Sequence, residues 1–259
     1  MTPPGGRGLV RWPAPAPRVR LLCVPHAGAG AALFVSWPSR LPAWIEVVGV
    51  RLPGRESRRR EPPLTSLDAM ADDVLERLGE LGDDLPVAVY GHCSGALAAL
   101  RITERLVRLG CRPVPRLFVS SAPSPSRPGI GEPVHLLSRS HLIRYLDDAG
   151  AGRFGDADVD EVFRLTEPAI RADFQAFETA VPLPVSALPV PITVFRARHD
   201  RVVSEASSHD WAGRTSRGVT RRVLPGRHFL LDTATADVLA GIRVDLTDDL
   251  TDDLADGAW

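Results

Sequence analysis

The chain has 259 residues, of which 44% are hydrophobic and 24% are charged, and its formal net charge at pH 7 is -1. This is the composition of an ordinary soluble domain, and the balanced charge argues against a nucleic-acid or membrane-surface partner. No apolar run has the length of a signal peptide or of a membrane-spanning helix, so we expect a cytoplasmic protein.

Short apolar runs, separated by helical or Gly/Pro-rich segments, predict the strands of a mostly parallel sheet. The runs cover residues 20–24, 46–50, 86–90, 116–120, 192–196 and 219–223. Residues 66–79 and 95–110 have helical periodicity. This alternation predicts an α/β fold in which helices flank a mostly parallel central sheet.

The strand–helix alternation stops between residues 124 and 191. Helices are expected there at residues 140–146, 158–165 and 169–180. An insertion between two core strands predicts a helical lid over an active site, and the alternative is a connection without function. The C-terminal leucines Leu246, Leu250 and Leu254 have helical spacing among aspartates, which favours a frayed helix or a solvated tail over a docked one.

These observations predict three parts of the chain. A core covers residues 1–123 and 192–243, a helical lid subdomain covers residues 124–191, and an acidic C-terminal tail covers residues 244–259.

The strongest motif is Gly91-His92-Cys93-Ser94-Gly95, which follows a buried run and precedes a helix start rich in small residues. This is the pattern of a nucleophile elbow, the sharp strand-to-helix turn of the α/β-hydrolase fold, with cysteine as the nucleophile. At a helix N-terminus the dipole and the free amides favour the thiolate. The alternative is an inert buried cysteine in a Gly-rich turn. Cys23, within a predicted strand, and Cys111, just past a predicted helix end, are expected to be inert. Three scattered cysteines predict neither disulfides nor a metal site.

An elbow needs a base and an orienting acid, which in this fold follow the nucleophile on loops after late strands. Asp200 follows the predicted strand at 192–196, and His228 follows the one at 219–223. We therefore predict a Cys93–His228–Asp200 triad. In it His228 accepts the thiol proton, and Asp200 orients the ring and stabilises the imidazolium.

The loop Pro25-His26-Ala27-Gly28-Ala29-Gly30 follows the first predicted strand, where this fold supplies one amide of an oxyanion hole. The other amide belongs to the residue after the nucleophile, Ser94. His26 and His92 lie in this loop and in the elbow, so they are candidates for lining the substrate pocket. The remaining histidines are expected at the surface or in the lid: His135, His141, His199 and His209.

With these residues in hand, residues 19–242 resemble the type II thioesterases that accompany modular polyketide and nonribosomal peptide synthases. The resemblance rests on Pro25-His26-Ala27-Gly28, Leu52-Pro53-Gly54-Arg55-Glu56 followed by Glu61-Pro62-Pro63, Gly91-His92, Arg171-Ala172-Asp173-Phe174, and Gly226 with His228-Phe229. It implies an acyl substrate on the phosphopantetheine arm of an acyl or peptidyl carrier protein, with no other cofactor. It also implies Ala27 and Ser94 as the oxyanion amides and supports Asp200 and His228.

The chain departs from that family at the nucleophile. Cys93-Ser94 stands where the family has serine followed usually by methionine, and Ala29 replaces the second glycine of the loop. A thioester on Cys93 stays activated and reacts better with a carbanion than with water, which favours release by an internal nucleophile. The chain is in this respect similar to stand-alone Dieckmann cyclases, which release tetramate or pyridone rings.

Dieckmann cyclisation is therefore the function that we predict from the sequence. Its nearest rival is a hydrolytic type II editing thioesterase, which removes aberrant acyl groups from carrier proteins. A different class is a carrier-binding scaffold without turnover. The basic run at residues 51–60 is interpreted either as a contact for an acidic carrier protein or as a solvated loop.

Overall fold

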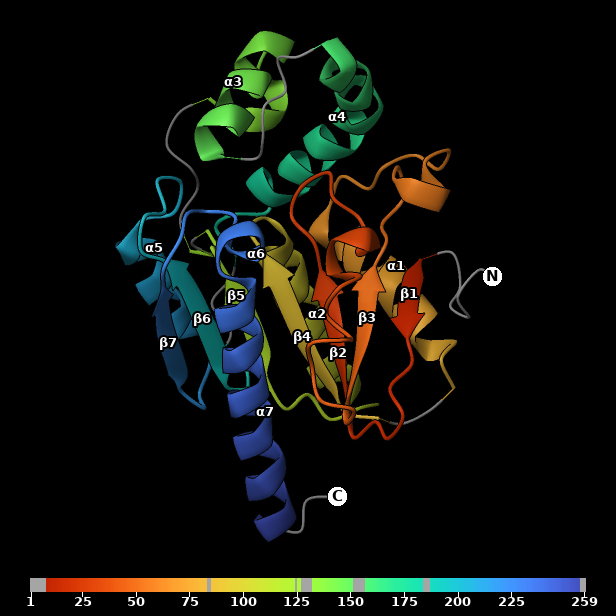
Figure 1. Cartoon of the computed structure of the whole chain (residues 1–259), viewed down its shortest axis with the longest axis vertical. Coiled ribbons are helices and arrows are strands. Elements are labelled where there is room, and N and C mark those ends of the chain that lie inside the picture. The colour runs from red at the N-terminus through yellow and green to blue at the C-terminus, as the bar shows by residue number, and fades with distance from the viewer. Residues whose placement is uncertain are drawn as a thin grey trace.

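The structure is a computed structural model that describes residues 8–82, 85–123, 125–126, 132–150, 157–183 and 187–256, without the side chains of residues 157–160 and 252–256. The predicted boundaries at residues 1, 124 and 259 lie outside these ranges. Figure 1 shows one central sheet with helices on both faces and two helices above one end of it.

The described residues form a seven-stranded sheet in the order β1-β3-β2-β4-β5-β6-β7. The strands are β1 (Leu9–Trp12), β2 (Val19–Val24), β3 (Ile45–Val50), β4 (Val87–His92), β5 (Leu117–Ser120), β6 (Ile192–Ala197) and β7 (Val219–Leu224). Neighbours are parallel except that β1 pairs antiparallel with β3. The six predicted runs are strands β2 to β7, which confirms the mostly parallel sheet. Edge strand β1 was not predicted because four residues before a proline give too short an alternation.

Helices cover both faces of the sheet. Helices α1 (Leu67–Gly79) and α2 (Gly95–Leu109) bury their apolar sides against one face, and α7 (Thr235–Asp256) packs on the other. Shorter helices are η1 (Ala31–Phe34), η2 (Glu56–Arg58), η3 (Val134–Leu136), α5 (Glu205–His209), η4 (Asp210–Arg214) and α6 (Leu230–Thr233). No helix among the described residues combines the length and the apolar character that a membrane span requires.

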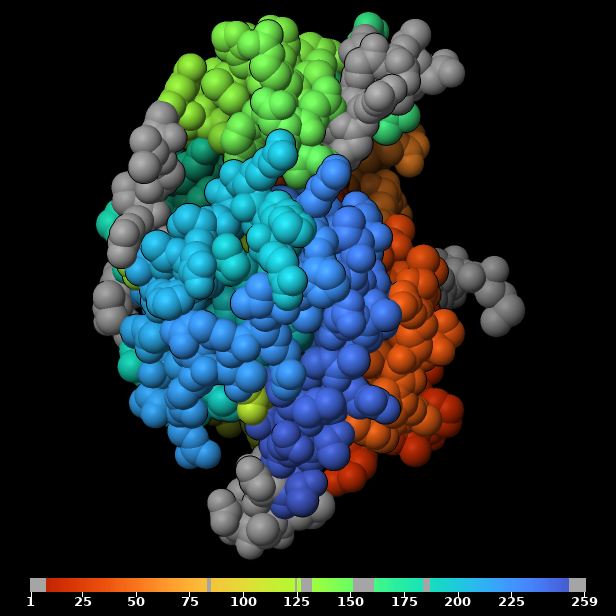
Figure 2. Space-filling model, turned by 60° about the vertical axis from the view of Figure 1, so that its left-hand side comes forward, coloured from red at the N-terminus to blue at the C-terminus, as the bar shows by residue number. Residues whose placement is uncertain are grey.

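The segment between β5 and β6, called here the helical insertion, contains α3 (Arg139–Ala149) and α4 (Ala157–Glu178). These helices lie above the carboxyl ends of the strands, and Figure 2 shows the insertion as a green cap on the molecule. The insertion has a small apolar core of its own, made of Val134, Leu142, Leu146, Phe163, Ile170 and Phe174.

The two helices predicted at residues 158–165 and 169–180 are one helix, α4, with Pro168 inside it. Proline lacks an N–H and usually ends a helix, which is why the sequence was divided there. Phe163 and Ile170 lie on the two sides of Pro168 and pack into the same apolar core. Their burial on one face of α4 holds the helix together across the lost hydrogen bond.

The acidic tail prediction is wrong for the described part of residues 244–259. Residues 244–256 continue α7, and Leu246 and Leu250 are buried against the sheet. Asp249 accepts hydrogen bonds of 2.7 and 2.5 Å from the Arg116 guanidinium, and Asp245 accepts one of 2.7 Å from Thr193. Aspartates that look solvated in the sequence thus pair with the sheet. The side chain of Leu254 and residues 257–259 lie outside the described residues.

Candidate active site

The turn between β4 and α2 has the geometry of a nucleophile elbow. Cys93 stands at its apex with φ +53, a left-handed conformation that costs a non-glycine residue about 1–3 kcal/mol. A Cβ atom on Gly91 would lie 2.5 Å from the Gly95 carbonyl oxygen. One on Gly95 would lie 2.2 Å from the carbonyl oxygen of Pro25. Both positions therefore require glycine, because backbone from the helix and from the loop after β2 fills the space.

The structure brings the three residues of the predicted triad together. His228 Nε2 lies 3.2 Å from Cys93 Sγ, and His228 Nδ1 lies 3.0 and 3.1 Å from the Asp200 carboxylate oxygens. Asp200 also accepts hydrogen bonds from the backbone amides of Val202 and Val203, which hold its carboxylate toward the ring. The side chains of Asp200 and His228 are both buried. Loops after β6 and β7 supply them, as the order of the motifs predicts.

Charge around the ring favours an ion pair between Cys93 and His228. Burial lowers the pKa of His228, but the negative charge of Cys93 and the hydrogen bond to Asp200 outweigh burial and raise that pKa to about 10. Burial likewise opposes ionisation of Asp200, and its contact with His228 outweighs this and lowers the pKa of the carboxyl group. The site is therefore arranged to hold a protonated His228 ring between the sulfur of Cys93 and the Asp200 carboxylate.

The ring of His228 is expected to stay protonated at about pH 8, where an ordinary histidine is neutral. Replacing Cys93 by alanine removes the largest contribution that raises the pKa, so the ring of the variant should lose its proton at a lower pH. Ring ¹⁵N NMR over a pH titration measures both values, and a His228→Gln variant assigns the signal. A wild-type ring that titrates near pH 6.5, the ordinary value, would contradict the ion pair.

The two candidate pocket histidines lie beside the triad. The His92 ring centroid is 6.0 Å from that of His228, and the His26 ring stands 5.0 Å from Phe229. Burial lowers the pKa of both His26 and His92, so both rings are neutral at pH 7. His92 Nδ1 lies 3.2 Å from Ser120 Oγ at the end of β5. They form an uncharged wall next to the triad and do not compete with His228 for the thiol.

The amides predicted for the oxyanion hole belong to Ala27 and Ser94. Among the described residues, no acceptor bonds the backbone N–H of Ala27 or that of Ser94, whereas the N–H of Cys93 donates to the Ser120 carbonyl. The loop that carries Ala27 packs against the elbow through the close approach of Pro25 to Gly95. Free amides beside a nucleophile are suited to bind a developing negative charge.

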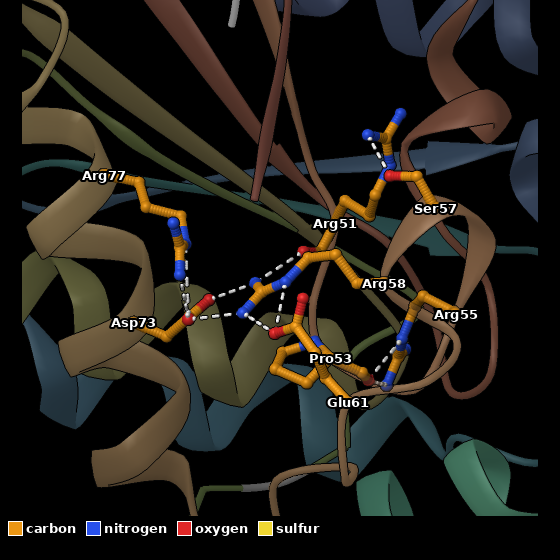
Figure 3. Close-up of polar contacts among 8 residues, drawn as sticks. All are labelled: Arg51, Pro53, Arg55, Ser57, Arg58, Glu61, Asp73 and Arg77. Carbon is orange, nitrogen blue, oxygen red and sulfur yellow. Dashed lines mark hydrogen bonds and ion pairs between the residues drawn. The ribbon is translucent and has the colours of Figure 1, made fainter. Parts of the chain in front are cut away.

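Arginines of the basic run at residues 51–60 make polar contacts within the fold, and Figure 3 shows those of Arg58 with Asp73 and Glu61. Arg58 is 2% exposed and donates paired hydrogen bonds to Asp73 and further ones to Glu61. Arg51 pairs with Glu56 at 2.6 Å. Arg55, 5% exposed, is also buried in an ion pair. Burial contradicts both interpretations of the run, a carrier-protein contact and a solvated loop, for Arg55 and Arg58. Arg51 is half-buried, and Arg59 and Arg60 are exposed.

Two features near the site were not predicted. Tyr145 of α3 packs on Phe174, and burial followed by the charge of Cys93 raises the pKa of its phenol, so the insertion comes within electrostatic range of the nucleophile. A lone tyrosine in a helix gives no sequence signal for this. The second feature is an ion pair between Arg55 and Asp173, which lie in two of the quoted family motifs.

The fold and this site define an α/β hydrolase whose candidate nucleophile is a thiol. Residues 19–244 match the model of the thioesterase domain. The chain therefore belongs to the thioesterase family.

Several known proteins similar to this chain are named for natural-product biosynthesis. A probable cadicidin biosynthesis thioesterase of Streptomyces griseus is 33% identical over 232 residues, which are 85% of this chain and 62% of that protein. The gramicidin S biosynthesis protein GrsT of Aneurinibacillus migulanus is 32% identical over 217 residues, 83% of this chain and 84% of GrsT. The solved structure of the type II thioesterase BorB from the borrelidin biosynthetic cluster has a TM-score of 0.79 at 31% identity, over 93% of this chain and 96% of BorB. The match thus spans under two thirds of the S. griseus protein.

Proposed function

We propose that this protein is a type II thioesterase that accepts an acyl chain from a carrier-protein thioester onto Cys93. The observation that carries the proposal is the sulfur of Cys93 at the apex of the elbow, 3.2 Å from His228 Nε2. The proposed catalytic residues are Cys93, His228 and Asp200, with the amides of Ala27 and Ser94 as the oxyanion hole. The similarity to pathway-associated thioesterases supports a substrate on a phosphopantetheine arm.

Acylation follows from the ion pair. The Cys93 thiolate attacks the thioester carbonyl, and the amides of Ala27 and Ser94 stabilise the tetrahedral oxyanion. When the carbon–sulfur bond of the substrate breaks, the His228 imidazolium gives its proton to the leaving pantetheine thiol. Asp200 keeps the ring oriented throughout. One thioester is exchanged for another, so this step is close to thermoneutral and needs neither a metal ion nor a cofactor of its own.

Hydrolysis is the release step that the relatives favour. Neutral His228 takes a proton from water, hydroxide attacks the acyl carbonyl, and the Cys93 thiolate leaves as the free acid forms. The proton stays on His228, so the ion pair is restored. A thioesterase of this kind would remove aberrant acyl groups from carrier proteins, in keeping with the names of its relatives.

Dieckmann cyclisation is the second candidate, and the sulfur of Cys93 is the observation that favours it. For a β-ketoamide held through its aminoacyl carbonyl, His228 would take a proton from the carbon between two carbonyls. The carbanion attacks the thioester, a carbon–carbon bond forms, and the bond to Cys93 breaks. The proton remains on His228 and the charge on sulfur, which again restores the ion pair. The ring then leaves as a tetramate or pyridone.

Incubation with a β-ketoamide thioester on a phosphopantetheinylated carrier protein tests both release steps. The mass of the released product is the measurement, because the cyclised product is lighter than the free acid by one water. Free acid alone would exclude cyclisation, and the lighter species would establish it. A thiol-directed acyl analogue is expected to label Cys93 in a Cys111→Ser background, since Cys111 is exposed. Absence of both label and product would instead favour the non-catalytic scaffold.

A further inference from the structure

Arg55 and Asp173, which are 118 residues apart, form a buried ion pair beside the loop at residues 25–30. Arg55 follows β3, and Asp173 lies in α4 of the helical insertion. The guanidinium donates two hydrogen bonds to the carboxylate, at 2.7 and 2.8 Å. Both side chains are nearly inaccessible, at 4% and 7% exposed. A paired, bidentate contact of this kind fixes both geometry and distance.

This ion pair also holds the backbone that follows Ala27. Asp173 Oδ2 accepts a hydrogen bond of 2.8 Å from the amide of Gly28, and Arg55 donates one of 3.0 Å to the carbonyl of Ala29. The loop is closed on itself by a hydrogen bond of 3.1 Å from the Ala29 amide to the His26 carbonyl. Peptide units on the C-terminal side of Ala27 are therefore fixed by residues from two other parts of the fold.

Apolar contacts hold the same loop to the insertion. The side chain of Ala27 packs against the apolar core of the helical insertion. Gly28 has φ +76, and a Cβ atom there would lie 2.3 Å from Ile170 of α4. The loop backbone thus rests directly on α4, and only glycine fits at residue 28. If α4 moved away, the loop would lose the hydrogen bond from the Gly28 amide to Asp173. It would also lose the apolar contacts of Ala27 and Gly28 with the insertion.

We propose that Asp173, together with Arg55, is a positioning residue that orients the Ala27 amide, so that docking of α4 completes the oxyanion hole. The inference rests on the proposed function, because it assigns the Ala27 amide to the oxyanion. The helical insertion is then a part of the reacting site as well as a cover over it. If the proposal is correct, acylation of Cys93 by a thioester depends on the docking of α4, whereas alkylation of Cys93 does not.

Two reactions of Cys93 separate positioning from folding. Acylation by a pantetheine thioester passes through a tetrahedral oxyanion, whereas alkylation by iodoacetamide displaces iodide from saturated carbon and forms none. In a Cys111→Ser background, Asp173→Asn is expected to lower kcat for the thioester by about 10- to 100-fold, with KM and the alkylation rate changed less than about two-fold. Asp173→Ala should lower kcat further, because asparagine keeps an acceptor for the Gly28 amide.

Glu167→Gln is the matched control. Glu167 lies on the same helix and pairs with Arg171 inside the insertion, and among the described residues it has no hydrogen bond or ion pair with residues 26–30, so this variant should keep the wild-type kcat. Equal losses of acylation and alkylation in Asp173→Asn would overturn the inference, because the loss would then be structural. Unchanged kcat in Asp173→Asn would overturn it too. A wild-type protein that is alkylated at Cys93 but never acylated would overturn the proposed function itself, and with it the inference.

Discussion

Replacing Cys93 by alanine is expected to lower kcat/KM for a carrier-bound thioester by about 10⁴-fold or more, because the alanine variant has no atom to take the acyl group. The fall in kcat/KM is measured by quenching the reaction at a series of times and determining the mass of the carrier protein. The covalent intermediate should be visible on the wild-type chain and absent from the variant. The fold should be unchanged, because Cys93 is partly exposed and, within the described part of the chain, its side chain makes one hydrogen bond.

Cys93→Ser is the informative comparison. Serine keeps a nucleophile at the apex of the elbow, but a hydroxyl is a weaker nucleophile than a thiol and forms a lower-energy oxoester, so acylation should be slower. If wild-type release is by cyclisation, the serine variant should release a larger share of free acid, because its acyl-enzyme is less activated towards a carbanion. Wild-type rates in Cys93→Ala would show that this thiol does not carry the acyl group.

Gly95→Ala is expected to destabilise the fold by about 3 kcal/mol or more, which is the upper range for forcing atoms into a packed site. The added methyl would lie 2.2 Å from the Pro25 carbonyl oxygen. The backbone of Val24 and Pro25 cannot move away without shifting β2, and that of Gly95 cannot move without shifting α2. The loop after β2 would be displaced, so activity should fall as well. Urea denaturation followed by circular dichroism measures the change in the free energy of unfolding.

Gly79→Ala is the control for this prediction. Apart from its chain neighbours and the backbone of α1 itself, no atom of the described residues lies within 4 Å of the position where its Cβ would stand, and Gly79 is the last residue of α1. Alanine there should leave stability unchanged or raise it by up to about 1 kcal/mol, because it is the better helix former. If both variants had similar stability, the close packing of the elbow against the loop after β2 would be refuted.

Much of the fold could be predicted from local pattern. The apolar runs correspond to β2 to β7, and helical periodicity correctly located α1 and α2, because burial on both faces of a parallel sheet leaves a direct mark on the sequence. The errors lie where a local rule met a tertiary contact. Pro168 divided α4 in the prediction, although packing of Phe163 and Ile170 keeps it continuous. Asp249 looked solvated, although it pairs with Arg116.

The candidate site also has residues that could be predicted from the sequence and contacts that could not. Cys93, Asp200 and His228 could be named because each follows a strand, and the carboxyl ends of parallel strands meet at one edge of a sheet. The partners of the arginines at residues 51–60 could not be named, since a run of like charges reads as a surface patch. Arg58 instead finds Asp73 on α1, and Arg55 finds Asp173 on α4.

The sequence by itself determined strands β2 to β7, the sharp turn around Cys93, and the candidate acid and base that follow that turn. These features depend on neighbours within a few residues, so their pattern is readable along the chain. Only the tertiary structure decided which charges are buried together and which helix contacts the loop at residues 25–30. Such contacts join residues that are distant in the sequence, 15 positions apart for Arg58 and Asp73 and 118 for Arg55 and Asp173, and they form only when the folded chain brings the two segments together.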